Sequence, residues 1–277
     1  MEWEASLEEN QKDEGVKRMK VIKDTRSPIR LLLLATFVTL ILWFIPYADW
    51  LVYPIRLFVT LIHESSHAIV GALTGASIKG LVVLPNGEGF VLASSDNWFS
   101  SLMLSSAGYL GTTACGAILL VLIRNQIDSK FILLSGSILL GIITFLFAFL
   151  IPSLNLFELV SAGNVGFTLL VGIITVCFLL FVAFKCSQGL QDFVVSFLAV
   201  QLILNALLDL KTLFILNAPI LGSHINTDAN NMANITGIPA IVWVIIWIVL
   251  SVIMVSIALR LYVIAQRTKH ELPFDDD

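Results

Sequence analysis

The sequence predicts an all-α polytopic membrane protein of six or seven transmembrane helices with one short β-hairpin. Of its 277 residues, 57% are hydrophobic and only 13% are charged, whereas soluble domains average about 45–50% and about 25%. The mean hydropathy is +0.92. Charge-poor windows also recur along the chain, and most reach the length of about 20 helical residues that spans a hydrocarbon core.

The composition excludes several classes of protein. An ordinary soluble enzyme and a disordered chain both carry more charge and fewer apolar residues than this one. The formal net charge is −4, from 16 basic and 20 acidic residues, so there is no basic footprint for nucleic acid. Cys115, Cys177 and Cys186 lie in or beside apolar runs, which is typical of small core residues and not of a disulfide framework. The expected environment is the lipid bilayer.

The two ends of the chain are polar. Residues 1–30 end in a basic cluster beside the first apolar run, which favours a cytoplasmic N-terminus by the positive-inside rule. We expect residues 31–260 to form a single transmembrane domain and residues 261–277 to form a polar C-terminal tail. Seven spans from a cytoplasmic N-terminus would place that tail outside, although its basic residues favour the inside. Either one segment is re-entrant, or the positive-inside preference of the tail does not decide its side. We expect a multi-pass protein of a bacterial plasma membrane.

The predicted helices follow from charge-poor windows, taken in chain order. The sixth window is short because Asp192 and Asp209 bound it, and the apolar part of the seventh begins near Ile238. The windows cover residues 31–48, 57–78, 97–123, 131–157, 159–184, 193–208 and 229–259.

A β-hairpin is predicted over residues 77–94, between the second and third windows. Two β-prone runs, 81–84 and 90–93, flank the turn sequence Asn86-Gly87-Glu88-Gly89. One interpretation is a plain surface turn. The other is an exposed strand edge that pairs with an extended substrate segment by β-augmentation. The residues expected to form that edge are Leu81, Val82, Val83, Gly87 and Gly89.

The second window contains the sequence His63-Glu64-Ser65-Ser66-His67. On a helix the two histidines lie one turn apart on the same face, and imidazoles at this spacing can hold one Zn²⁺ ion. Glu64 can then take a proton from a zinc-activated water as general base. The alternative is a polar cluster that joins helices by hydrogen bonds.

A hydrolytic zinc site needs a third protein ligand and an open position for water. Asp209 is the preferred candidate, because Gln201, Asn205 and Asp209 form one polar stripe on an apolar helix, with Asn205 in support. Asp228 is the alternative third ligand, although an aspartate just before a helix commonly caps it. Loop and tail side chains are usually solvated, which makes three further groups weaker candidates: Glu158, His224 and His270.

Several stretches occur in an order that resembles one known family. They comprise a histidine-bearing helix, a glycine hairpin, a glycine-rich helix and a C-terminal block with aspartates: residues 63–75, 86–89, 107–111 with Gly116, 206–209, 227–229, and 236–239 with Trp243. This arrangement resembles the site-2 protease class of intramembrane metalloproteases, and more closely the M50B-like branch of peptidase family M50. The resemblance implies one zinc ion held by His63 and His67, with Glu64 catalytic.

The function expected from this resemblance is hydrolysis of peptide bonds in membrane-embedded or membrane-adjacent substrates. The chain departs from better-known members, because Asp209 is followed by Leu210 where they carry an Asp-Gly pair. That departure favours a second hypothesis, a catalytically inactive membrane binding or chaperone protein. A third hypothesis is a transporter, because ionisable residues within membrane helices also mark ion pathways.

Overall fold

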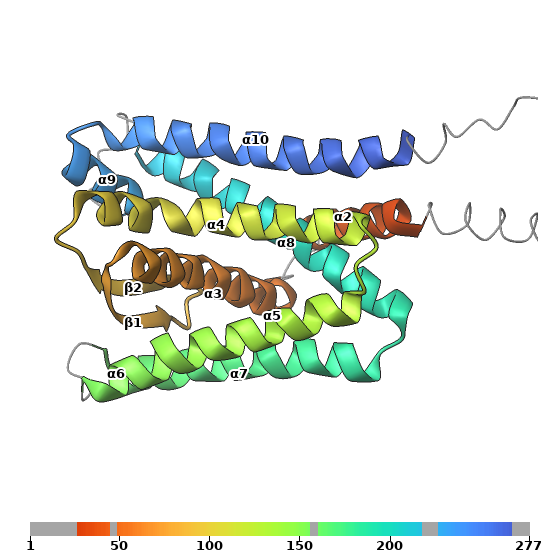
Figure 1. The fold of residues 1–277 in the computed structure, drawn as a ribbon, viewed down its shortest axis with the longest axis horizontal. Coiled ribbons are helices and arrows are strands. Elements are labelled where there is room, and N and C mark those ends of the chain that lie inside the picture. Colours follow the sequence, from red (N-terminus) through yellow and green to blue (C-terminus); the bar gives the residue numbers. More distant parts are fainter. Residues whose placement is uncertain (1–26, 45–48, 156–159, 218–226, 268–277) are drawn as a thin grey trace, which may run out of the picture.

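The computed structural model describes residues 27–44, 49–155, 160–217 and 227–267, and these residues are mostly helical (Figure 1). A single two-stranded sheet interrupts the helices within this part of the chain. The elements are α2 (Ser27–Phe44), α3 (Asp49–Thr74), β1 (Ser77–Val83), β2 (Gly89–Ser94), α4 (Trp98–Arg124), α5 (Ser129–Ile143), the π-helix η1 (Thr144–Leu150), α6 (Ile151–Leu154), α7 (Ala162–Lys185), α8 (Gln188–Leu216), α9 (Asp228–Thr236) and α10 (Ala240–Arg267).

Six helical segments of the described residues are long and apolar enough to cross a membrane. Large apolar side chains such as Phe131, Ile173 and Phe181 are exposed on their outer faces, as contact with lipid requires. The prediction of an all-α polytopic protein with six or seven such helices is confirmed. The six segments are Trp50–Thr74, Trp98–Arg124, Ser129–Leu154, Ala162–Lys185, Gln188–Leu216 and Ala240–Leu261.

The helix predicted over residues 193–208 is longer than expected. It runs over Gln188–Leu216, a length of 29 residues. The prediction ended the helix at two aspartates because a charged side chain is costly in lipid. Asp192, however, accepts a hydrogen bond of 2.6 Å from Ser129 Oγ, and Asp209 lines a cavity. Asp192 is thus paired and Asp209 borders a cavity, so neither aspartate ends the helix.

The predicted hairpin of residues 77–94 is present as an antiparallel pair of strands. It folds back along α3, and two α3 side chains hold its turn. Tyr53 Oη donates a hydrogen bond of 2.7 Å to the Pro85 carbonyl, and Thr60 Oγ1 donates one of 2.8 Å to the Gly87 carbonyl. Gly87 has a φ of +85°, a conformation that glycine adopts without strain. The turn therefore lies beside the N-terminal half of a candidate membrane-spanning helix.

The strand that was expected to be exposed is the buried one. The side chains of Leu81, Val82 and Val83 are 0% exposed, because β1 packs under η1 and α7. The Val83 N–H donates a hydrogen bond of 2.9 Å to Thr168 Oγ1 of α7. Backbone at membrane depth must have its polar groups satisfied by protein, which explains this burial. The more exposed strand is β2, whose side chains are half-buried or exposed.

Helix α4 is central to the arrangement, since it packs against α3, α8, α9 and α10. Glycines on α4 allow this close approach. A Cβ at Gly116 would lie 2.7 Å from Ile203 Cγ1 of α8, and one at Gly111 would lie 2.5 Å from Ser66 Oγ of α3. The hairpin, α9 and the N-terminal end of α4 gather at one end of the helices (left in Figure 1).

Candidate metal centre

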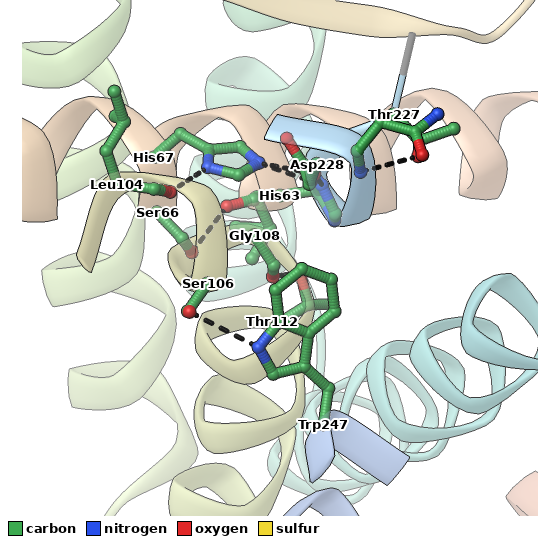
Figure 2. Close-up of polar contacts among 12 residues, drawn as sticks. His63, Ser66, His67, Leu104, Ser106, Gly108, Thr112, Thr227, Asp228 and Trp247 are labelled. Atoms are coloured by element: carbon green, nitrogen blue, oxygen red, sulfur yellow. Dashed lines mark hydrogen bonds and ion pairs between the residues drawn. The ribbon is translucent and has the colours of Figure 1, made fainter. Parts of the chain in front are cut away.

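Helix α3 presents His63 and His67 on one face, as the spacing predicts. Their Nε2 atoms lie 3.1 Å apart, and Figure 2 shows both rings turned toward the same point. His67 and the intervening Glu64 are buried, with 6% and 5% of their surface exposed. Titratable groups at this depth are costly unless they share partners or a metal ion.

Helix α9 brings a carboxylate to the two histidines. Asp228 Oδ2 lies 3.3 Å from His67 Nε2 and 3.7 Å from His63 Nε2. Asp228 was expected from the sequence to cap the helix, but Thr227 takes that role, because its Oγ1 accepts a hydrogen bond of 3.3 Å from the Asn230 N–H. The Asp228 carboxylate in the first turn is therefore directed to the histidines (Figure 2).

The three groups have the dimensions of a metal site. Ligand atoms about 2.0–2.1 Å from a tetrahedral zinc ion lie about 3.3–3.4 Å from one another. The separations among the two Nε2 atoms and Oδ2 are 3.1, 3.3 and 3.7 Å. Two imidazoles and one carboxylate are also a donor set typical of catalytic zinc. The residues therefore fit the ion.

A hydrogen bond at the second ring nitrogen fixes the orientation of His67. Its Nδ1 lies 2.6 Å from the Leu104 carbonyl oxygen of α4. A carbonyl can only accept, so Nδ1 carries the proton, and the Nε2 lone pair is free in the neutral ring. Metal-bound histidines are commonly held by such a second hydrogen bond.

Gly108 leaves the space that the two imidazole nitrogens occupy. A Cβ at this position would overlap Nε2 of His63 and Nε2 of His67 together. Helix α4 thus passes close against the two ligand atoms at Gly108, which Figure 2 labels beside the histidines. Glycine here is required for the two imidazoles to take these positions, and not only for helix packing.

The electrostatics of Asp228 agree with a role beside positive charge. Burial on its own would raise its pKa, but the imidazoles of His67 and His63, in the protonated form that donates to the carboxylate, outweigh burial and hold the pKa of Asp228 below its usual range. A cation in the same place would act in the same direction. The carboxylate is therefore ionised, as a metal ligand must be.

Comparison with known proteins now identifies the family. The sequence profile described as Peptidase M50B-like matches residues 33–258. The chain belongs to the Peptidase M50B-like family. The match includes α3 and α9, and hence all three residues of the cluster. No curated protein and no solved structure matches the chain significantly.

In this M50B-like protein, Asp209 lies apart from the three-residue cluster. It lines a cavity of about 370 Å³ together with His63, Glu64 and Asn205, whereas the described groups that could share an ion are His63, His67 and Asp228. The geometry thus favours the alternative third ligand over the preferred one. The polar stripe on α8 has another use: Gln201 Nε2 donates a hydrogen bond of 2.7 Å to Thr39 Oγ1 of α2. The weaker candidates Glu158, His224 and His270 lie outside the described residues.

The carboxylate of Glu64 lies between the metal cluster of the M50B-like chain and its hairpin. Glu64 lines the same cavity as His63 and Gly89. A Cβ at Gly89 would lie 2.7 Å from both Cγ and Oε1 of Glu64. The start of β2 therefore has to be glycine for the carboxylate to occupy its position.

Sequence reasoning on this M50B-like chain missed contributions from α4. Gly108 was given no role beyond its place in the glycine-rich stretch 107–111, and the Leu104 carbonyl carries no side-chain signature. Tyr109, which lines the cavity, was quoted in the glycine-rich stretch but was given no role. The available signal was the glycine-rich segment 107–111, whose partner on α3 could not be identified from the sequence.

Proposed function

We propose that this protein is an intramembrane zinc metalloprotease. The observation that carries the proposal is the convergence of His63 Nε2, His67 Nε2 and Asp228 Oδ2 beside Glu64, at a cavity among membrane-spanning helices. His63, His67 and Asp228 would hold one zinc ion. Membership of the M50B-like family supports a peptidase of the membrane.

The chemistry divides between the ion and Glu64. Zinc, when bound, lowers the pKa of water and polarises a peptide carbonyl. Glu64 accepts one proton from water as the water oxygen bonds to the carbonyl carbon. It then delivers that proton to the amine nitrogen as the C–N bond breaks. The second proton of the water stays on the cleaved carbonyl group, so the products are one carboxylic acid and one amine, with Glu64 returned to its ionised form.

The hairpin gives the substrate a path to this site. A helical peptide bond is shielded by its own hydrogen bonds, so a transmembrane substrate must unwind locally. Since β1 is buried, an unwound segment would add along β2. Gly87 and Gly89 line the cavity with Glu64, so a segment at this end of the hairpin would pass close to the general base.

The test is cleavage by purified protein in detergent, incubated with an isotope-labelled extract of membrane proteins. New N-termini in the labelled proteins are read by mass spectrometry, and zinc is measured by elemental mass spectrometry. We expect about one zinc ion per chain. Glu64→Gln should keep the zinc and lose cleavage by about 10²–10⁴-fold. The matched control is Asp96→Asn, which removes a carboxylate from an exposed residue outside the cavity.

Three results would contradict the proposal. Cleavage that survives Glu64→Gln would exclude Glu64 as the base. Absence of zinc from the wild-type protein after supplementation would exclude the metal centre. Stable capture of an intact membrane protein without cleavage, unchanged by Glu64→Gln, would instead support the inactive binding or chaperone hypothesis.

A further inference from the structure

Tyr109 is held rigidly beside the metal cluster. Its ring meets the His63 ring edge to face, with centroids 4.7 Å apart and an interplanar angle of 81°, and stacks on Trp247 of α10 at 5.5 Å and 26°. Trp247 is itself 1% exposed, and its Nε1–H donates a hydrogen bond of 3.2 Å to Ser106 Oγ. Contacts on two sides leave the Tyr109 ring little freedom to turn.

The hydroxyl of this rigid ring has no partner among the described residues. Tyr109 is half-buried, and a buried tyrosine hydroxyl usually finds a hydrogen bond. Tyr53, by contrast, gives its hydroxyl proton to the Pro85 carbonyl. Tyr109 Oη is not fully buried either. The described residues include a few side-chain polar atoms that are fully buried without a hydrogen bond, and Tyr109 Oη is not one of them. Tyr109 lines the cavity with His63 and Glu64, and we infer that its hydroxyl, neither paired nor fully buried, faces that cavity.

We propose that Tyr109 donates a hydrogen bond to the substrate carbonyl oxygen as negative charge develops on it. The inference rests on the proposed function, since it concerns the same reaction. A fixed donor aimed at developing charge needs no reorganisation at the moment of reaction, and loss of one such donor costs about 10²–10³-fold in rate. The phenol keeps its proton throughout, because Glu64 carries out the proton transfers. Trp247 is then a positioning residue that acts through Tyr109.

A purely structural role is the competing explanation. In that case Tyr109 would only support the His63 ring, and the loss of its hydroxyl would change nothing. Tyr109→Phe separates the two roles, because phenylalanine keeps both ring contacts and removes only the donor. Tyr53→Phe is the matched control, since Tyr53 lies outside the residues that line the cavity.

The experiment uses the full-length protein loaded with Co²⁺, whose visible absorption reports its ligands. Acetohydroxamate is titrated into the wild type, Tyr109→Phe and Tyr53→Phe, since this anion presents an oxygen beside the metal as a reacting carbonyl would. We expect Tyr109→Phe to weaken acetohydroxamate binding by about ten- to a hundredfold, as for loss of a hydrogen bond to a charged group. Co²⁺ affinity should not change, and Tyr53→Phe should match the wild type.

The outcomes distinguish this inference from the proposed function. Equal acetohydroxamate affinity in the wild type and Tyr109→Phe would overturn the inference and leave the metalloprotease proposal standing. Weaker Co²⁺ binding by Tyr109→Phe would also overturn it, because the tyrosine would then support the ligands. Failure of the wild-type protein to bind Co²⁺ or Zn²⁺ would overturn both.

Discussion

Gly108→Ala is the most direct test of the metal centre. The substitution adds one methyl group to α4 and changes no charge and no hydrogen-bonding side chain. In an ordinary membrane helix such a change is mild, and alanine has the higher helix propensity by about 1 kcal/mol. Here the methyl carbon would overlap the Nε2 atoms of His63 and His67. We therefore expect a specific loss of zinc.

The magnitude follows from what must move. Carbon and nitrogen atoms need roughly 3.5 Å between them, so the overlap is relieved only if α4 retreats or an imidazole turns away. Turning His67 breaks its 2.6 Å hydrogen bond to the Leu104 carbonyl. Loss of an outer-shell partner alone costs about 10–100-fold in metal affinity. Because a ligand atom is displaced as well, we expect a loss of at least about 100-fold.

The assay is a zinc titration against a competing chelator, with the protein in detergent. Two glycines serve as controls. Gly111→Ala is matched sterically, since its Cβ would lie 2.5 Å from Ser66 Oγ but touch neither histidine. Gly136→Ala is neutral, with nothing within 4 Å of the added Cβ. Both should keep zinc. Wild-type zinc affinity in Gly108→Ala would refute the assignment of the ion to the space between the two imidazoles.

Three further predictions follow from the same geometry. Gly89→Ala would place a methyl 2.7 Å from Glu64 Oε1, so cleavage should fall by at least about 100-fold, while elemental analysis should still find zinc. Loss of zinc together with cleavage would contradict the separation of the base from the metal ligands. Asp228→Asn should release the metal and Asp209→Asn should retain it, and the reverse result would restore Asp209 as third ligand. Thr168→Val leaves a buried β1 backbone N–H without its partner, so the free energy of unfolding in detergent should fall by about 1–3 kcal/mol; an unchanged denaturation midpoint would show that this hydrogen bond adds nothing.

Local patterns were enough to predict most of the elements. The apolar windows predict membrane-spanning helices because a bilayer rewards about 20 consecutive apolar residues whatever their neighbours. The turn at Asn86–Gly89 predicts the hairpin because hairpin geometry is set by its few central residues. The pairing of His63 with His67 follows from helical periodicity. The length of α8 was missed because Ser129, which donates to Asp192, lies on α5, and the cavity at Asp209 is lined by several elements.

The assembly of the site depended on tertiary structure. Asp209 and Asp228 are both plausible ligands by residue type, and helical spacing cannot say which lies within about 4 Å of two imidazoles on α3. The structure favours Asp228, because Thr227 caps α9 and leaves the Asp228 carboxylate directed toward the histidines.

The same division holds for the glycines and the strands. The sequence alone determined that a His63-Glu64-His67 helix lies in a membrane bundle beside a hairpin. Only the packing of α4 on α3 revealed that Gly108 opposes the ligand atoms, and only the packing of α7 on β1 revealed which strand is buried. The physical reason is range: backbone propensity and helical periodicity act between near neighbours in the chain, whereas ligand and packing distances join residues that only the complete fold brings together.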